Sequence, residues 1–456
     1  MSLAFLVIVI YLLAVILLSI YFTKYVKTSE DFTVAGRSLP GIILAGTFMA
    51  TWMGSGTVVG GTNSLAYRHG PWVAIIFGMA APIGIVILYL LSKKIHELKM
   101  QTVPDVLEYK YGEAARVIGS LIIILAYVGI TSYQYSGIGF VLNATLGIPT
   151  KIGTLIGAIV VIGSAVLGGL YSVAYTDFMS ACIMLLGLAI GIPVAISGAG
   201  GWAAVASKLP PEHLKLGGLS ALSIMGYFFP LFFLILGDQN MYQRFFAAKD
   251  PKAAKWGAIG WFFGVVVVMP LVAYGATTSR ALFPNLNPGM ALIRLSSDAM
   301  PPIIGALCLA AISAFIITTG NSYLLSSAVN LGWDIYARVI RRSATDESRL
   351  AVTRWGVIIL GVLAYVLITY FPTVLSVQMY AYTMYGASIT PALLAAVLWP
   401  NVKPSAGISS MVVGAIVTLA WELSGKPYGL ASVIVAAPAA IVTLFLVNII
   451  LLMRKE

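Results

Sequence analysis

The feature that most constrains this chain is a succession of apolar runs, each about as long as a membrane-spanning helix. A helix needs about 20 largely apolar residues to cross the hydrocarbon core of a bilayer. Hydropathy and helix breakers divide the 456 residues into about thirteen such runs. The sequence therefore predicts an all-α integral membrane protein. The predicted spans are residues 3–23, 41–67, 71–91, 115–141, 153–170, 177–196, 219–237, 256–277, 301–331, 355–370, 380–398, 407–423 and 429–453.

Composition supports lipid as the main solvent. Hydrophobic residues make up 60% of the chain and charged residues 9%, against about 25% charged in soluble domains. The net charge of +11 is spread over many connectors instead of one patch, which argues against a nucleic-acid partner. Cys182 and Cys308 both lie inside apolar runs, so neither a disulfide framework nor a cysteine metal site is expected.

The distribution of basic residues predicts the orientation. Cytoplasmic connectors of membrane proteins are enriched in Lys and Arg. With the N-terminus outside, the inside connectors receive most of the 27 Lys and Arg residues. We therefore predict a multi-pass protein of the plasma or inner membrane, with an outer N-terminus and a cytoplasmic C-terminus. The basic residues left outside are Arg68, Lys151, Lys208, Lys215, Arg280, Arg294 and Lys426.

The order of the spans also predicts an internal repeat. Without the first span and the last two, ten helices remain in two groups of five, and an odd number per group gives the groups opposite orientations. Transporters built this way bind their solute near the midplane, where helices are interrupted. The predicted divisions are an extra helix and linker (1–40), the first repeat (41–197), an extracellular connector (198–218), the second repeat (219–399) and two extra helices (400–456).

The second span contains glycines at membrane depth, at Gly54, Gly56 and the pair Gly60-Gly61. Glycine loosens a helix and leaves carbonyl groups free to coordinate a cation. Glycine also permits close packing of membrane helices, and taken alone this second interpretation is the more common one. Trp52, just before these glycines, fits contact with a solute or with lipid equally well.

The ninth span places four oxygen-bearing side chains within about one and a half helical turns, at Thr318, Thr319, Asn321 and Ser322. Sodium takes hard oxygen ligands, including hydroxyl and backbone carbonyl oxygens. Ser and Thr in membrane helices also commonly bond back to a carbonyl four residues earlier. Both interpretations stay open at this point.

Two acidic residues fall at the ends of spans, Asp177 and Asp238. Acidic residues within membrane spans are functional candidates because they are costly to bury. The alternatives are structural: Asp177 could cap a helix, and Asp238 could pair with Arg244. The residues alone favour neither interpretation.

Taken in order, four stretches resemble the sodium/solute symporter family, whose members carry proline, pantothenate, sugars, sialic acid or choline. They are AGRSLP at residues 35–40, residues 168–177, Asp238 with YQRFFAAK at 242–249, and Leu324-Leu325 with DIY at 334–336. This resemblance covers most of the chain. It implies a leucine-transporter-type core of two inverted five-helix repeats, with Na⁺ as the coupling ion.

The resemblance also implies a main sodium site. Counting along the matching motifs assigns the carbonyl groups of Ala50, Met53 and Phe315, together with the hydroxyl groups of Thr318 and Thr319. Relatives usually have alanine at the position of Phe315, a change that a carbonyl ligand tolerates. They commonly have Ser-Ser or Ser-Thr where this chain has two threonines, and the hydroxyl groups are kept.

Some members of the family hold a second sodium ion. The matching positions here are Asp177, Asn321 and Ser322, where asparagine replaces a hydroxyl group, so the resemblance implies either a second sodium site or part of the exit path. The solute is expected between the interrupted helices and their partners. The implied solute residues are Trp52, Thr57, Tyr133, Gln134, Phe229, Phe233 and Tyr382.

We therefore expect a sodium-coupled secondary active symporter that imports a small organic solute by alternating access. An enzyme is not expected, because no nucleophile–base pair or metal-ligand cluster lies within the spans. A proton-coupled permease of the same fold is the nearest alternative, and an ion channel is a more distant one. The sequence leaves open the solute, the sodium stoichiometry and the oligomeric state.

Overall fold

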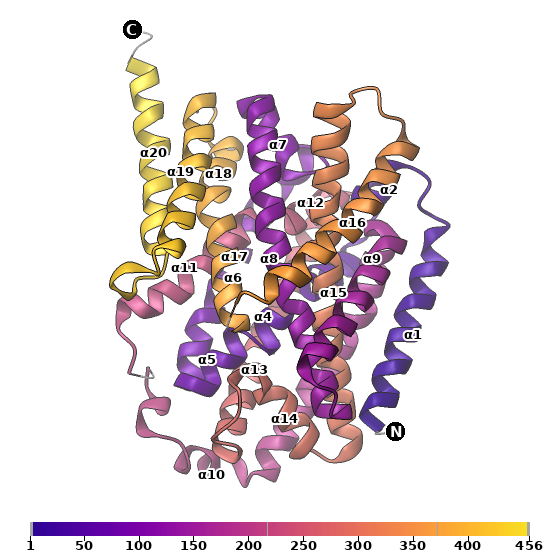
Figure 1. Cartoon of the computed structure of the whole chain (residues 1–456), viewed down its shortest axis with the longest axis vertical. Helices are drawn as coiled ribbons and strands as arrows, with labels where there is room; N and C mark the ends of the chain where they lie inside the picture. Colours follow the sequence, from indigo (N-terminus) through magenta and orange to yellow (C-terminus); the bar gives the residue numbers. More distant parts are fainter. Residues whose placement is uncertain (1–2, 217, 372, 454–456) are drawn as a thin grey trace.

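The computed structural model of the chain describes residues 3–216, 218–371 and 373–453 and is a bundle of long helices (Figure 1). Within these residues no strand forms, and a single bridge joins Leu39 and Ala248. The all-α prediction is confirmed. The two ends of the chain lie at opposite ends of the bundle (Figure 1). Arg454 and Lys455, which the orientation argument places inside, are outside the described residues.

Eleven helices in the described residues are long and apolar enough to cross a membrane, or twelve when one bent pair is included. The remaining predicted span, 153–170, corresponds to Thr150–Val166, which is shorter than the others, so the count of thirteen stays a prediction. The elements are α1 (Leu3–Thr23), the bent pair α3 (Gly41–Trp52) with α4 (Ser55–Val58) and α5 (Gly61–His69), α6 (Pro71–Glu97), α8 (Glu113–Leu146), α9 (Thr150–Gly198), α11 (Ala221–Gly237) with α12 (Gln239–Ala247), α13 (Pro251–Leu282), α15 (Pro302–Val329) with η4 (Asn330–Ile340), α16 (Asp346–Ile368), α17 (Val374–Ser388) with α18 (Thr390–Leu398), α19 (Pro404–Leu423) and α20 (Val433–Met453).

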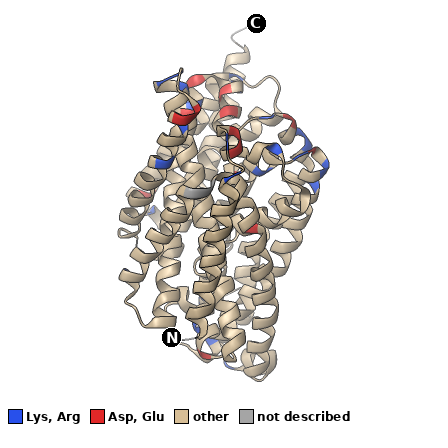
Figure 2. Cartoon of the chain, turned by 90° about the vertical axis from the view of Figure 1, so that its right-hand side faces the viewer, with Lys and Arg blue, Asp and Glu red and all other residues tan. Residues whose placement is uncertain are grey.

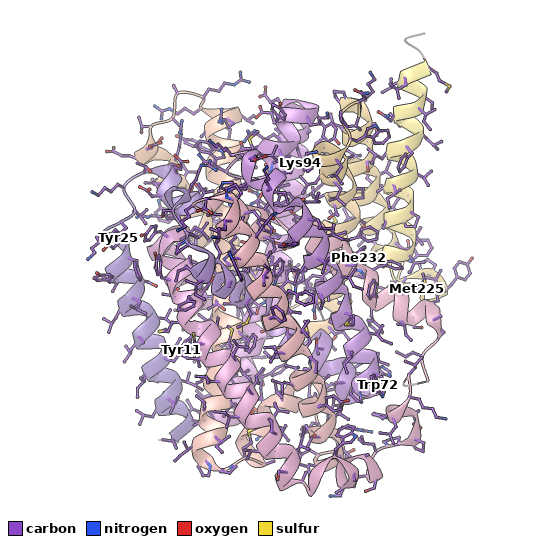
Figure 3. All side chains as sticks on the ribbon, turned by 180° about the vertical axis from the view of Figure 1, so that it is seen from behind. Tyr11, Tyr25, Trp72, Lys94, Met225 and Phe232 are labelled. Atoms are coloured by element: carbon purple, nitrogen blue, oxygen red, sulfur yellow. The ribbon has the colours of Figure 1, made fainter. Side chains whose placement is uncertain are left out.

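Short helices connect the long ones. Lys, Arg, Asp and Glu gather at the two ends of the bundle, and the middle is almost free of them (Figure 2). Helix α6 runs between these ends, from Trp72 near one to Lys94 near the other (Figure 3). The connecting elements are α2 (Ser29–Val34), η1 (Ala35–Arg37), α7 (Val103–Tyr111), α10 (Gly201–Ser207), η2 (Pro211–Leu214), η3 (Pro288–Met290), α14 (Ala291–Asp298) and η5 (Pro427–Gly429).

Helix α1 packs one face against the protein and exposes its other faces to lipid. One narrow stripe of it is buried, and the Tyr11 hydroxyl lies 2.8 Å from the Ser180 hydroxyl on α9. The other faces are apolar and exposed, which is stable only in lipid. The buried stripe is Ile8, Tyr11, Val15 and Ser19, and the exposed residues include Ile10, Leu13, Leu17 and Ile20.

The first helix of each predicted repeat is interrupted. Helix α3 ends at Trp52, Met53 is extended, and the pair α3 and α4–α5 is bent by 53°. A Cβ at Gly54 would meet the Thr319 side chain at 2.6 Å, so this glycine serves both the break and close packing. In the second group the chain breaks between α11 and α12 at Asp238.

Helix α9 contains a third break. Gly169 has φ of 56° and ψ of 179°, a conformation that other residues rarely adopt, and a Cβ there would meet Phe32 at 2.6 Å. The second part of α9 therefore begins at Gly169, eight residues before the predicted start of the span. Asp177 lies well inside this helix, so the interpretation of Asp177 as a helix cap is wrong.

Candidate functional site

The atoms predicted as main sodium ligands converge where α3 ends beside α15. The Thr318 hydroxyl lies 2.9 Å from the Ala50 carbonyl and 3.4 Å from the Phe315 carbonyl. The Thr319 hydroxyl lies 3.2 Å from the Ala50 carbonyl and 3.0 Å from the Met53 carbonyl. Both threonines are buried. We call these three carbonyl and two hydroxyl oxygens the oxygen cage.

The break in α3 explains why the carbonyl groups of Ala50 and Met53 are available. The Met53 N–H donates to Met49 at 3.1 Å and completes α3, and the extended conformation of Met53 then ends the helix. Carbonyl groups in the last turn of a helix have no partner within it and must find one elsewhere. Here they face the hydroxyl groups of α15. The cage is neutral and contains only hard oxygen atoms, which suits sodium.

The structure also contains the alternative contact of the α15 threonines, in which a hydroxyl group bonds back to the carbonyl four residues earlier. The Thr318 hydroxyl lies 2.7 Å from the Ala314 carbonyl, four residues earlier. A hydroxyl group donates one proton, yet this one lies within reach of three carbonyl oxygens. If Thr318 donates to Ala314, its lone pairs can face a cation held by the other oxygen atoms. Back-bonding and cation binding are therefore compatible.

Asp177 belongs to a cluster separate from the oxygen cage. This cluster lies about one helical turn closer to the end of the bundle that we predict to be cytoplasmic. Its carboxylate accepts hydrogen bonds from Thr47 at 2.6 Å and from Thr51 at 3.0 Å, and lies 3.3 Å from Arg244. Arg244 also donates to Thr51 and, at 3.0 Å, to Ser322. We call these five residues the Arg244 cluster. All five are buried.

This cluster bears on two interpretations of charged residues that the sequence left open. Arg244 forms its ion pair with Asp177, and not with Asp238, the partner that the sequence left open as an alternative. The residues proposed for a second sodium ion, Asp177, Asn321 and Ser322, do not form one group. The Asn321 amide lies 2.7 Å from the Ser164 hydroxyl on the first part of α9, because adjacent residues on a helix point about 100° apart.

Asp238 occupies the break between α11 and α12 and contacts tyrosines. Its carboxylate accepts hydrogen bonds from Tyr323 at 2.7 Å, from Tyr127 at 3.1 Å and from the Asn240 N–H at 2.8 Å. The Tyr385 hydroxyl donates to the Gly237 carbonyl at 2.7 Å. We call Asp238 with Tyr127, Tyr323 and Tyr385 the tyrosine cluster. The sequence analysis missed these tyrosines, which lie on three different helices.

Several predicted solute residues surround the break in the first repeat. The Tyr133 and Tyr382 hydroxyl groups lie 3.3 Å apart, joining α8 to α17. The Gln134 side chain accepts a hydrogen bond from the Ser55 N–H at 2.8 Å. Trp52 packs edge-on against Trp261 with ring centroids 5.8 Å apart. Thr57 is buried within α4.

The structure separates two predicted residues from this group and adds one. Phe229 and Phe233 pack against an apolar cluster formed by α17 and α20, away from α4. Gln378, which the sequence analysis missed, accepts a hydrogen bond from the Gly61 N–H at 2.7 Å and donates to the Gly56 carbonyl at 3.2 Å. Its side chain therefore braces the glycine-rich segment from α17. A glutamine inside an apolar run is the signal that could have identified it.

Comparison with known families assigns the class of protein. Residues 32–414 match the sodium:solute symporter family, and the chain belongs to that family. It is therefore a multi-pass membrane transporter and not an enzyme.

Individual relatives match over most of the chain. The chain is 27% identical to the high-affinity proline transporter PutP of Bacillus subtilis, covering 95% of this chain and 96% of that protein. It is also 27% identical to a sodium/proline symporter of Staphylococcus aureus, covering 93% and 86%.

Solved structures show the same fold. A Na⁺-coupled sialic acid symporter superposes with a TM-score of 0.83 at 19% identity, covering 98% of each chain. MhsT in complex with L-phenylalanine superposes with a TM-score of 0.58 at 14% identity, covering 89% of this chain and 97% of that one. These likenesses establish a leucine-transporter-type helical fold for the chain.

Proposed function

We propose that this protein is a symporter that couples the inward movement of sodium to the import of a small organic solute. The observation that carries the proposal is the oxygen cage, in which buried neutral oxygen atoms of α3 and α15 converge at a helix break. When a monovalent cation leaves a neutral cage, no buried net charge remains behind. That property suits an ion that must bind and be released in every cycle.

The contacts around the cage suggest how sodium and solute are coupled. Sodium in the cage joins the end of α3 to α15, which fixes the segment that begins at Gly54. Gln134 and Gln378 hold the same segment from the other side. Sodium binding therefore favours the state in which the solute site is formed, and alternating access follows when both are occluded and then released inside. The inside end, by the distribution of basic residues, is the end that carries the C-terminus.

We further propose that one sodium ion moves in each cycle. The resemblance implies either a second sodium site or part of the exit path at Asp177, Asn321 and Ser322. Arg244, however, lies within 3.3 Å of the Asp177 carboxylate and 3.0 Å of the Ser322 hydroxyl. The guanidinium group supplies the positive charge that the buried carboxylate needs. A second sodium ion at this position would put another positive charge beside the guanidinium.

For the solute, a small amino acid is our first candidate. Two relatives are named as proline transporters. The buried carboxylate of Asp238 lies at the break of the second repeat among tyrosines, and it favours a solute with a positively charged group.

The test is uptake of radiolabelled proline into proteoliposomes under imposed gradients. We expect accumulation with an inward sodium gradient, loss of accumulation in Thr318→Ala/Thr319→Ala, and normal accumulation in Thr418→Ala, a buried threonine of α19 far from the cage. Uptake that ignores sodium and collapses with a protonophore would support the proton-coupled alternative. Accumulation of another amino acid under sodium would change the solute and leave the coupling intact.

A further inference from the structure

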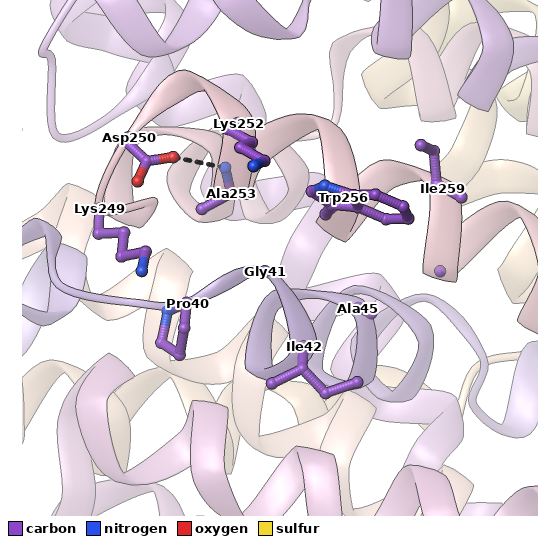
Figure 4. A pocket seen from close by; sticks show the side chains of 11 residues that line it. Pro40, Gly41, Ile42, Ala45, Lys249, Asp250, Lys252, Ala253, Trp256 and Ile259 are labelled. Atoms are coloured by element: carbon purple, nitrogen blue, oxygen red, sulfur yellow. Dashed lines mark hydrogen bonds between the residues drawn. The ribbon is translucent and has the colours of Figure 1, made fainter.

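A groove opens between α3 and α13 at the end of the bundle that carries Lys249 and Lys252 (Figure 4). Its volume is about 560 Å³. Neither the oxygen cage nor the tyrosine cluster contributes to its lining. By the positive-inside distribution, its mouth lies at the cytoplasmic surface of the membrane.

The walls of the groove are apolar and face the lipid. Ile42 on α3 is 65% exposed and Trp256 on α13 is 57% exposed. The floor is narrow because glycines let the two helices approach: a Cβ at Gly260 would meet the Ala45 Cβ at 2.3 Å. A tryptophan at this depth is typical of the boundary between hydrocarbon and headgroups. The groove therefore fits an acyl chain that lies along the helices.

The mouth of the groove is positively charged. Lys249 and Lys252 are exposed, and their side chains lie at the opening (Figure 4). The nearby Asp250 carboxylate accepts a hydrogen bond from the Ala253 N–H at 2.6 Å and so caps α13. The backbone here is fixed, because the Lys249 N–H donates to the Leu39 carbonyl at 3.0 Å. The two ammonium groups are thus carried by an ordered segment.

A second apolar furrow lies on the other side of the exposed ridge of α13. It has a volume of about 210 Å³, runs between α6 and α13, and shares Ile259 with the first groove. Lys255 stands near it, with its ammonium group 5.9 Å from the centre of the Tyr89 ring. Two furrows separated by one ridge, both with lysine nearby, match the shape of a lipid with two acyl chains.

We propose that this surface binds an anionic diacyl phospholipid of the cytoplasmic leaflet. The phosphate group lies between Lys249 and Lys252, one acyl chain fills the groove beside α3, and the other fills the furrow beside α6. Basic pockets between membrane helices on the cytoplasmic side recognise anionic headgroups in this way. The bound lipid joins α13 to α3, the helix whose far end carries Ala50 and Met53 of the oxygen cage.

The test is the melting temperature of the full chain in neutral detergent with added phosphatidylglycerol, phosphatidylcholine or inorganic phosphate. We expect phosphatidylglycerol to raise the melting temperature by several degrees more than phosphatidylcholine does, since a ligand stabilises the state it binds. Lys249→Gln/Lys252→Gln should lose this difference. Lys93→Gln/Lys94→Gln, which removes the same charge at the same end of the bundle, should keep it.

Three results would overturn the proposal. Equal rises with both lipids would indicate ordinary solvation by lipid, and an unchanged preference in Lys249→Gln/Lys252→Gln would place the anionic lipid elsewhere. An equal rise with inorganic phosphate would indicate a free anion site. If the double variant does not fold, Ile42→Trp fills the groove and leaves both lysines intact. Native mass spectrometry should then show fewer bound phosphatidylglycerol molecules, and an unchanged number contradicts the proposal.

Discussion

The oxygen cage and the Arg244 cluster lie on neighbouring turns of the same two helices, but their chemistry differs. Thr318 and Thr319 of the cage precede Ser322 of the Arg244 cluster by about one turn of α15, and Ala50 and Thr51 are adjacent on α3. The cage is neutral, whereas the Arg244 cluster contains a carboxylate and a guanidinium group. The comparison suggests that the oxygen cage suits an exchangeable cation, whereas the Arg244 cluster contains a permanent cation, the guanidinium group.

Burial explains this division of roles. A buried carboxylate left without a partner costs several kcal/mol, so Asp177 needs a positive charge in every state of the transporter. A covalently attached guanidinium group meets that need and cannot diffuse away. The cage carries no net charge, so it could release a bound cation at small cost.

The largest effect should come from removing the permanent cation. Arg244→Gln leaves Asp177 buried and unpaired, and we expect it to lower the free energy of unfolding by about 3–5 kcal/mol. The double variant Arg244→Gln/Asp177→Asn should regain most of this loss, because the Arg244 cluster then contains no buried charge. Denaturation of the purified protein followed by tryptophan fluorescence measures both values. Equal instability of the single and double variants would contradict the ion-pair role.

Removing one hydroxyl group of the cage should have the next largest effect. In Thr319→Val the side chain keeps its shape and loses a ligand, so we expect the sodium concentration for half-maximal uptake to rise at least about tenfold, or about 1.4 kcal/mol. Thr319→Ser keeps the hydroxyl group and should remain close to the wild type. Sodium titration of initial uptake rates distinguishes the two variants. A rise in Thr319→Ser as large as that in Thr319→Val would show that shape, and not the oxygen atom, matters here.

A smaller effect is expected in the Arg244 cluster from Ser322→Ala. Loss of the hydrogen bond from Arg244 should lower the free energy of unfolding by about 0.5–1.5 kcal/mol. The sodium affinity should not change, because the Ser322 hydroxyl faces the guanidinium group and not the cage. Thermal unfolding and sodium titration on the same preparation check both statements. A clear loss of sodium affinity would mean that the two clusters share an ion.

The smallest effect is expected from Asn321→Ser. This change restores the hydroxyl group that relatives with two sodium ions carry, yet Asn321 points toward Ser164 and Arg244 holds the neighbouring carboxylate. We expect the Hill coefficient for sodium to stay near one, with less than about a twofold change in affinity. A coefficient that rises toward two would contradict our assignment of Arg244 as the permanent cation.

The helical class could be predicted from the sequence because apolar runs depend on local order along the chain, whereas the residues of the oxygen cage were implied by the resemblance to a known family. Apolar runs have the length of a span, and motifs before α3 and after α15 give the register of Ala50 and Thr318. The ion pair between Asp177 and Arg244 could not be predicted in this way, because it joins α9 to α12 through the rotation of both helices. Asp238, which lies only a few residues from Arg244 along the chain, was the partner that the sequence offered.

The same physical reason explains the other differences. Phe229 and Phe233 occupy one face of α11, and only packing against α17 and α20 decides where that face points. The tyrosine cluster collects side chains from α8, α15 and α17, so no single segment contains it. The break in α9 depends on Gly169, one glycine among the 45 in the chain, and only its positive φ distinguishes it from glycines that serve packing.

The most direct test of the account is a comparison of melting temperatures in sodium chloride and potassium chloride at equal ionic strength. It needs no solute, and it compares the wild type with Thr318→Ala/Thr319→Ala. We expect a sodium-specific rise in the wild type that disappears in the double variant, because the cation stabilises the state that binds it. An equal sodium-specific rise in both proteins would place the ion outside the oxygen cage and contradict the central claim.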